Sequence, residues 1–325
     1  MKLATLKDGS RDGTLIVVAR DLTQAVSTPA LARTMQAACD DWETIAPQLQ
    51  SLAHELKAGT AKDTFAFDAN AVAAPLPRAY QWCDGSAFLH HGRLMEKAFN
   101  TPPMPDFETI PLMYQGGSDD FLGACDEVPF RSEEHGIDFE GEYGVIVDDV
   151  PMGCTPEEAA PHVKLIVQIN DWSLRGFGPR EMKTGFGFLQ AKPSTAFAPV
   201  AVTPDELGEA WRDGRVHLPL NVQWNGAWFG HPNGREMNFC FYELIAHAAK
   251  TRRLRAGTII GSGTVSNADR RAGSACISER RVIERLDEGA SKTSFMRFDD
   301  TVRMEVLSEA GQSIFGAIEQ RVVKA

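Results

Sequence analysis

Two glutamates one residue apart, Glu140 and Glu142, have the spacing in this 325-residue chain that most directly suggests chemistry. They belong to Asp138-Phe139-Glu140-Gly141-Glu142-Tyr143-Gly144-Val145-Ile146-Val147, where alternating acids lead into an apolar run typical of a strand that becomes buried. Alternate side chains of a strand share a face, so both carboxylates lie side by side, with Asp138 in line. Such a cluster needs a compensating cation, and all-oxygen ligand sets favour Mg2+, Ca2+ or Mn2+. The alternative is an ordinary strand end whose acids face water.

A third carboxylate, Asp171, follows another strand-like run at residues 163–169, in the segment Asn170-Asp171-Trp172-Ser173. An acid at the end of a buried strand is often only a turn or helix cap. Together with the two glutamates, Asp171 could instead complete a site for a hard cation.

Asp84 and His91 lie seven residues apart, directly after a proline-rich segment. Histidine is the side chain best suited to moving protons near pH 7, although most histidines are structural hydrogen-bonding residues. Because the adjacent His90 and His91 point in different directions, at most one of them faces a given site.

A lysine and a glycine loop complete the candidates. Lys192 precedes Pro193 in an extended stretch, whereas an ordinary lysine is a solvated surface charge. Gly261-Ser262-Gly263-Thr264 follows a strand-like run and could present N–H groups and the Thr264 hydroxyl to an anionic substrate. The loop matches neither a P-loop nor a dinucleotide fingerprint, so we infer no nucleotide.

The elements that must position these residues are mostly short strands. Pro75 and Pro77 form an extended segment that suits a boundary between a small domain at 1–74 and a larger one at 75–325. Before it, we expect strands at 2–6 and 14–19 and helices that begin at Thr28-Pro29 and end at Gly59. After it, short strands and glycine-rich turns dominate, including a hairpin at Asn225-Gly226. The pattern predicts an α+β fold that is mainly β.

Composition excludes several classes of protein. A formal net charge of −11 argues against binding nucleic acid or an anionic membrane, and no run approaches the roughly 20 apolar residues that span a bilayer. The six scattered cysteines indicate neither a zinc site nor a disulfide framework. Since the first residues turn polar at once, we expect a cytoplasmic location.

Taken in order, these motifs resemble those of the fumarylacetoacetate hydrolase (FAH) family from roughly Pro75 to the C-terminus. The resemblance implies an FAH-type mixed β-sandwich roll with a small N-terminal α/β domain, usually a homodimer with one divalent cation per subunit. The roles it implies are metal ligands Asp84, Glu140, Glu142 and Asp171, catalytic residues His91, Lys192 and Glu279, and substrate-binding residues Tyr114 and Thr264. Asp138 is left as flanking charge, and Glu279 departs from the family spacing by one residue.

Two departures bear on the substrate. Acylpyruvate hydrolase relatives carry a glutamate three residues after the histidine, where this chain has Leu94, which favours the fumarylacetoacetase branch. Against that, fumarylacetoacetases place a glutamine seven residues after the metal-binding aspartate, where this chain has Gly178.

The implied reaction is hydrolytic cleavage of a carbon–carbon bond in a 1,3-diketo acid. The cation would stabilise the departing enolate, His91 oriented by Glu279 would deprotonate water, and Lys192 would stabilise the oxyanion. Fumarylacetoacetate would give fumarate and acetoacetate, in tyrosine and aromatic-acid degradation. Alternatives within the family are acylpyruvate hydrolysis, oxaloacetate decarboxylation, and hydration or isomerisation of a 2-oxo acid. The alternative from another class is a metal- or ligand-binding module without catalysis.

Overall fold

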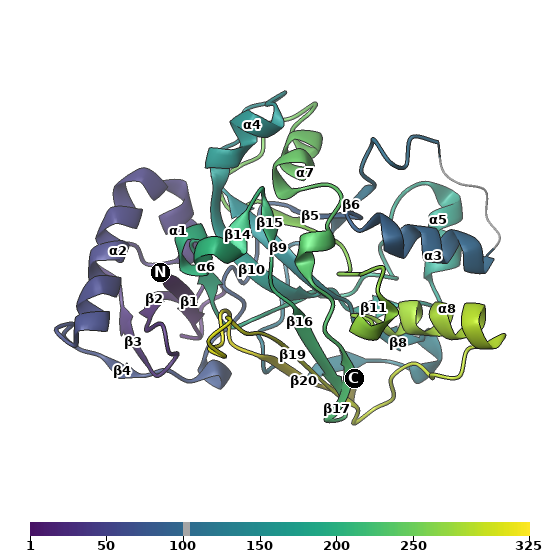
Figure 1. The fold of residues 1–325 in the computed structure, drawn as a ribbon. Coiled ribbons are helices and arrows are strands. Elements are labelled where there is room, and N and C mark those ends of the chain that lie inside the picture. Colours follow the sequence, from purple (N-terminus) through teal and green to yellow (C-terminus); the bar gives the residue numbers. More distant parts are fainter. Residues whose placement is uncertain (100–104) are drawn as a thin grey trace.

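The computed structural model describes residues 1–99 and 105–325, and its architecture is α+β and mainly β, as predicted (Figure 1). In the described residues the larger sheet has 11 strands, and β12 (Ala196–Phe197) pairs with β10 off its main path. The main order is β4 (Phe65–Ala66), β3 (Gln24–Ser27), β2 (Thr14–Val18), β1 (Lys2–Leu6), β13 (Ala201–Val202), β10 (Val163–Asn170), β9 (Gly141–Val147), β18 (Ile259–Gly261), β5 (Trp82–Gly85) and β6 (Met113–Gly116).

A second sheet of five strands packs against the middle of the first. Its order is β17 (Ala227–Gly230), β16 (Leu220–Trp224), β19 (Thr301–Val306), β20 (Ile318–Lys324) and β7 (Val128–Phe130). Two small ribbons are formed by β8 (Ile137–Asp138) with β11 (Ser173–Leu174), and by β14 (Trp211–Arg212) with β15 (Arg215–Val216).

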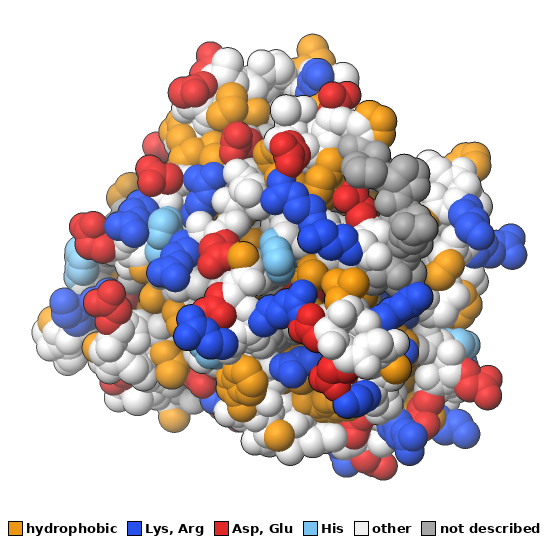
Figure 2. Space-filling view, turned by 45° about the vertical axis from the view of Figure 1, so that its right-hand side comes forward, with side chains coloured by type: hydrophobic (Ala, Val, Ile, Leu, Met, Phe, Trp, Pro, Cys, Tyr) orange, Lys and Arg blue, Asp and Glu red, His pale blue; other side chains and the backbone are white. Residues whose placement is uncertain are grey.

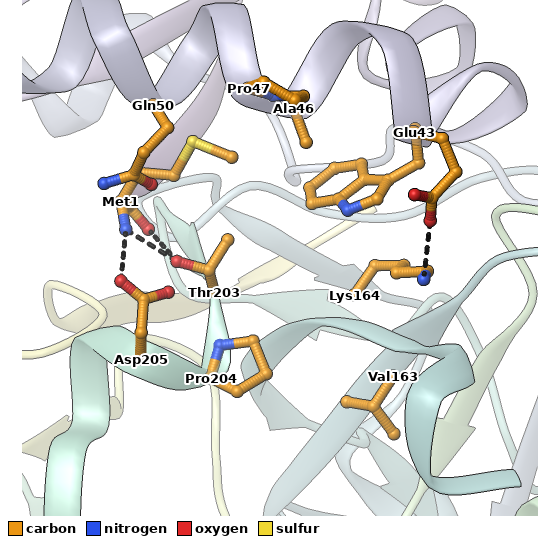
Figure 3. Close-up of a pocket in the computed structure, with 11 residues that line it drawn as sticks. Met1, Glu43, Ala46, Pro47, Gln50, Val163, Lys164, Thr203, Pro204 and Asp205 are labelled. Atoms are coloured by element: carbon orange, nitrogen blue, oxygen red, sulfur yellow. Dashed lines mark hydrogen bonds and ion pairs between the residues drawn. The ribbon is translucent and has the colours of Figure 1, made fainter.

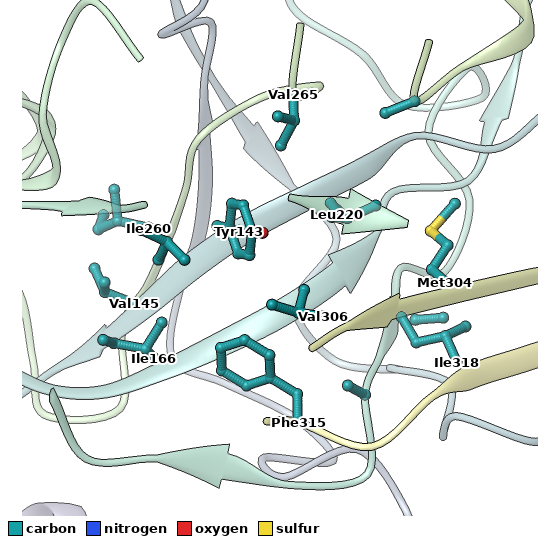
Figure 4. Close-up of a cluster of buried hydrophobic side chains, with 14 of the residues drawn as sticks. Tyr143, Val145, Ile166, Leu220, Ile260, Val265, Met304, Val306, Phe315 and Ile318 are labelled. Atoms are coloured by element: carbon teal, nitrogen blue, oxygen red, sulfur yellow. The ribbon is translucent and has the colours of Figure 1, made fainter. Parts of the chain in front are cut away.

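The space between the two sheets is filled by apolar side chains from both (Figure 4). Val145 and Ile166 come from the first sheet, and Met304 and Ile318 come from the second. Tyr143 lies among them and donates its hydroxyl hydrogen to the Leu218 carbonyl at 3.0 Å, so its one polar atom is satisfied. Burial of this apolar surface is the main force that holds the sheets face to face.

The helices lie around the sheets in pairs (Figure 1). At the left of Figure 1, α1 (Met35–Asp40) and α2 (Trp42–Ala58) cover the N-terminal strands, and at the top α4 (Pro156–Ala159) packs on α7 (Phe241–Ala248). At the right, α3 (Leu89–Phe99) packs on α8 (Ile277–Glu288). The short helices α5 (Gly178–Thr184) and α6 (Pro204–Leu207) lie in connections.

The expected helix start at Thr28-Pro29 is wrong. The Thr28 hydroxyl donates to the carbonyls of Leu15 and Ala32, so it does not cap a helix. The first helix starts at Met35 instead, and the side chain of Thr34 accepts from the Ala37 N–H. The predicted end at Gly59 is confirmed, since Gly59 adopts a left-handed φ of 70° after α2.

The N-terminal strands continue the large sheet rather than forming a separate one. Lys2 of β1 lies opposite Val202 of β13, which is far along the chain. The α2 helix crosses above this junction, where its residues Ala46 and Pro47 face Thr203 and Pro204 across a surface pocket (Figure 3). The boundary between residues 74 and 75 stays a prediction.

The hairpin at Asn225-Gly226 is confirmed, because both residues have positive φ, 50° and 75°, as a primed two-residue turn requires. On the surface drawn in Figure 2, acidic and basic side chains are interspersed, without a broad area of one sign. In residues 1–99 and 105–325, no helix combines the length and apolar character needed to cross a membrane.

Candidate metal centre and active site

Three carboxylates meet at one end of the large sheet. Asp84 lies on β5, Glu142 lies on β9, and Asp171 directly follows β10. One oxygen from each lies within 4.8 Å of the other two, and all three residues are buried. The alternative that Glu142 lies at a strand end and faces water is therefore wrong.

Glycines explain how Asp84 and Glu142 can reach each other across an intervening strand. In the sheet register Asp84 lies beside Gly261 of β18, which lies beside Gly144 of β9. Glu142 is two residues from Gly144 and shares its face. A Cβ atom on Gly261 would lie 2.3 Å from Asp84 Oδ1, so the carboxylate occupies space that any other residue would fill.

Both carboxylate oxygens of Glu142 are buried and accept no hydrogen bond from residues 1–99 or 105–325. Burial, together with the negative charges of its neighbours, raises the pKa of Glu142 well above its usual range, and the pKa of Asp84 is raised in the same way. Unpaired buried oxygens beside other carboxylates are costly unless a cation or protons compensate. The donor set contains only oxygen, so the residues fit a hard divalent cation such as Mg2+, Ca2+ or Mn2+.

The remaining predicted ligand, Glu140, is paired with two cationic side chains. Lys192 Nζ lies 2.7 Å from Glu140 Oε2 and 2.5 Å from Asp171 Oδ2, while Arg175 contacts Glu140 Oε1 at 2.5 Å. Burial opposes ionisation of Glu140, but these two cations outweigh it and hold its pKa below the usual range. The same carboxylates raise the pKa of Lys192 against its burial. Glu140 lies outside the three-carboxylate group, and its role as a ligand stays a prediction.

His91 and Glu279 form a hydrogen-bonded pair next to this centre. His91 Nδ1 lies 2.6 Å from Glu279 Oε2, and the His91 ring helps to lower the pKa of Glu140. The pair depends on the packing of α3 on α8, where Leu94 contacts Val282 one helical turn beyond each partner. The leucine that departs from the acylpyruvate hydrolase pattern therefore supports the histidine through packing.

Asp138 is fully buried and hydrogen-bonded to α8 and to Arg175, so its interpretation as mere flanking charge is wrong. Its carboxylate accepts from the first two N–H groups of α8, at Ile277 (2.8 Å) and Ser278 (2.9 Å). It also accepts from Arg175 Nε at 2.8 Å. Asp138 thus holds both the helix that carries Glu279 and the arginine that contacts Glu140.

Arg175 is a residue of the site that the sequence motifs did not single out. A signal was present, since Arg175 lies four residues after Asp171 in the polar segment that ends a buried strand. Arginine with two carboxylate partners is suited to buried ion pairs because its guanidinium carries several donors in one plane.

Tyr114 and the glycine loop complete the surroundings of the carboxylates. The Tyr114 hydroxyl donates to Asp171 Oδ2 at 2.6 Å, and burial followed by the charge of Asp171 raises the pKa of Tyr114. The Gly263 N–H donates to Asp84 Oδ1 at 2.9 Å, so the expectation that this N–H faces an anionic substrate is wrong. Thr264 is buried directly after it.

Family models match nearly the whole chain. "Fumarylacetoacetate (FAA) hydrolase C-terminal" matches residues 81–323, and "Fumarylacetoacetase N-terminal domain 2" matches residues 1–78. The chain is 30% identical to 2,4-didehydro-3-deoxy-L-rhamnonate hydrolase of Sphingomonas sp. (strain SKA58) over 50% of this chain and 54% of the relative. It is 26% identical to oxaloacetate tautomerase YisK of Bacillus subtilis (strain 168) over 59% of this chain and 61% of the relative.

The match thus spans somewhat more than half the length of these curated relatives. Among solved structures, maleylpyruvate hydrolase from Sphingobium sp. SYK-6 in complex with manganese(II) and pyruvate superposes with a TM-score of 0.66 at 16% identity, covering both chains fully. That likeness shows the fold. Since the larger family model covers most of the sequence, the chain belongs to the fumarylacetoacetate hydrolase family.

Proposed function

We propose that the protein is a divalent-metal-dependent hydrolase that cleaves a carbon–carbon bond in 1,3-diketo acids, with fumarylacetoacetate as its substrate. Two observations carry the proposal together: the His91–Glu279 pair, whose imidazole acts on Glu140, and the buried group of three carboxylates. The carboxylates supply ligands for a cation, and the pair supplies a base for water. A module that only binds metal has no need of such a base.

Asp84, Glu142 and Asp171 would hold the cation, with Glu140 as a fourth ligand once its pairing with Lys192 is exchanged. A divalent ion bound there supplies a Lewis-acid charge that stabilises an enolate leaving group. The relative whose structure contains manganese(II) and pyruvate supports both a divalent ion and a small oxo acid at such a site.

His91 acts as the base in this proposal. An ionised carboxylate only accepts hydrogen bonds, so contact with Glu279 places the ring hydrogen on Nδ1 and leaves the Nε2 lone pair free. The Nε2 atom takes a proton from water as the water oxygen attacks a substrate carbonyl. Glu279 stabilises the imidazolium that forms and keeps the ring in place.

Lys192 carries the positive charge that steadies the oxyanion of the attacked carbonyl. Its ammonium already lies at the centre, beside Glu140 and Asp171, and is released toward the substrate oxygen as these carboxylates turn to the cation. Tyr114, fixed by Asp171, and Thr264 are proposed to contact the substrate. The cytoplasmic location and the homodimer stay predictions.

The test is a panel of 1,3-diketo and 2-oxo acids assayed with Mg2+, Ca2+ and Mn2+. We expect loss of the diketone absorbance of fumarylacetoacetate and formation of fumarate and acetoacetate. His91→Ala should lower kcat by about 100-fold or more, as loss of a general base does. Unchanged absorbance of fumarylacetoacetate and every acylpyruvate with all three metals would instead favour a binding module.

A second candidate is tautomerisation of a 2-oxo acid, which the resemblance to an oxaloacetate tautomerase favours. The same base and cation could move a proton between carbon and oxygen without breaking a carbon–carbon bond. Product analysis separates the two functions, because only hydrolysis yields two acids from one substrate.

A further inference from the structure

A second pocket, with a volume of about 460 Å³, lies where the N-terminal strands meet the loop between β19 and β20. It is lined by Lys2 of β1, Arg20 after β2, His217, and residues of the 206–210 and 308–314 segments. The loop near residue 310, yellow in Figure 1, lies beside the N-terminal strands. None of the carboxylates of the metal centre lines this pocket.

Lys2 occupies a position where an apolar side chain is the ordinary choice. On β1 it shares a strand face with Ala4, which packs in the core between the two sheets. Lys2 is only 2% exposed, yet its ammonium group has one hydrogen-bond partner, the Ser313 carbonyl at 2.7 Å. Among the described residues no carboxylate forms an ion pair with it, and burial lowers the pKa of Lys2 to about 8 although the charge of nearby Glu206 opposes this. A buried ammonium with this environment is expensive unless something anionic joins it.

Two further donors of the same pocket lack acceptors. Arg212 donates to His217 Nδ1 at 3.3 Å, and because a guanidinium cannot accept, the ring hydrogen of neutral His217 is on Nε2. In the part of the chain that the structure describes, that buried Nε2 atom has no partner, and neither does the buried hydroxyl oxygen of Ser313. Lys2, His217 and Ser313 therefore offer three kinds of donor to one space.

The pocket seen in Figure 3 provides a contrast. There the lysine, Lys164, has its ammonium 2.9 Å from Asp148 Oδ2 and 3.5 Å from Glu43 Oε1. Its charge is balanced by the protein itself. The lack of a carboxylate in direct contact with the Lys2 ammonium is therefore not shared by the lysine that lines this other pocket.

From these contacts we propose that the pocket between β1, His217 and the β19–β20 loop is a binding site for a small organic carboxylate, separate from the metal centre. The two oxygens of a carboxylate have enough lone pairs to accept from all three kinds of donor. Arg20 and Arg212 line the pocket together with the acids Glu206, Glu209 and Glu309. Because three glutamates offset the three cations of the lining, each added negative charge meets some repulsion, so a singly charged carboxylate suits the site better than a phosphate dianion. Binding would tie the N-terminal strands to the larger domain.

The test is isothermal titration of the full-length, chelator-treated protein, so that no metal can bind acids at the carboxylate centre. The probes are acetate, pyruvate and succinate, with inorganic phosphate as the competing anion and matched sodium chloride as the blank. We expect saturable binding of at least one carboxylate at about one site per chain. Lys2→Met should weaken it at least about tenfold, which corresponds to 1.4 kcal/mol. Ser313→Ala should weaken it by a smaller factor, and Lys164→Met should leave it unchanged.

Lys2→Met is expected to fold, since methionine fills the same space and removes a buried charge, and its thermal unfolding midpoint should not fall. Four results overturn the proposal. They are no saturable binding of any carboxylate, phosphate binding more tightly than every carboxylate, equal affinity in wild type and Lys2→Met, or equal loss in Lys164→Met. Because the metal is absent throughout, failure of the diketo acid hydrolase proposal leaves this result intact, and the reverse also holds.

Discussion

At the scale of single residues, Glu142 is the most informative side chain of the molecule. It is fully buried, it accepts no hydrogen bond, and it lies among other carboxylates. Its raised pKa means that the metal-free folded protein holds protons more tightly than the unfolded chain does. The stability that those protons provide is fully present below the usual carboxyl pKa of about 4 and is lost as pH rises through the raised pKa.

Glu142→Gln should therefore stabilise the metal-free protein at high pH, by roughly 1–3 kcal/mol, because it removes a buried charge without a partner. The difference in unfolding free energy between variant and wild type should grow as pH rises from about 4. Denaturant unfolding across pH measures it, with Glu157→Gln, an exposed glutamate, as the control. If the unfolding free energies of wild type and Glu142→Gln changed with pH in parallel, the Glu142 carboxylate would not have the raised pKa on which this prediction rests.

Gly261 supports the centre by having no side chain. A Cβ atom there would come within 2.3 Å of both Asp84 Oδ1 and the Trp82 ring. Gly261→Ala should displace the Asp84 carboxylate, weaken divalent metal binding, and cost about 2 kcal/mol of stability from overpacking. Metal titration followed by calorimetry tests this, and Gly117→Ala, where the nearest atom is 4.0 Å away, is the matched control. Wild-type metal affinity in Gly261→Ala would contradict the role of the glycine.

At the scale of elements, the packing of α3 on α8 determines whether His91 has its carboxylate partner. Asp138 fixes the start of α8 by accepting from its first two N–H groups, and it also holds Arg175. The short β8 ribbon that carries Asp138 thus connects the sheet to the helix that carries Glu279.

Asp138→Asn keeps the size of the side chain but removes the charge that balances Arg175. We expect a loss of about 3 kcal/mol in unfolding free energy, as when one partner of a buried ion pair is removed. We also expect at least about a tenfold fall in kcat/KM, with a shifted pH profile, because the His91–Glu279 pair loses its support. Asp269→Asn, at another capping aspartate that is half-exposed, should change neither. An unchanged pH profile in Asp138→Asn would make its role merely structural.

The elements also show what could be predicted from sequence. The buried strand after Glu140 and the turn at Asn225-Gly226 are local patterns, and the structure bears them out. The α8 helix could not be predicted from its pattern, because the segment Ile277–Glu288 is dominated by charged residues and has only a narrow apolar stripe.

Contacts across long sequence separations could not be predicted from local patterns. His91 and Glu279 are 188 residues apart, and only family resemblance suggested the pair. Asp138 was misjudged because an alternating strand pattern does not show that the chain leaves the sheet at Phe139-Glu140, which turns Asp138 toward α8. The pairing of Lys192 with two of the acids likewise depends on tertiary structure.

At the scale of the whole molecule, the large sheet brings three carboxylates together in one buried group. Asp84 lies on β5, Glu142 lies on β9, and Asp171 follows β10. The sheet runs continuously from the N-terminal strands through β13 to the strands that carry the carboxylates. The carboxylate centre and the pocket at Lys2 therefore lie on one continuous framework.

The most direct test of the central claim follows fumarylacetoacetate cleavage while Mn2+ or Mg2+ is titrated into chelator-treated protein. Metal-free protein should be at least about 100-fold slower, and activity should rise to a plateau at one ion per chain, because the enolate needs the metal charge. Glu142→Gln should show no such rise at the same concentrations. Cleavage that persists at full rate in excess chelator would contradict the assignment of Asp84, Glu142 and Asp171 as the catalytic metal site.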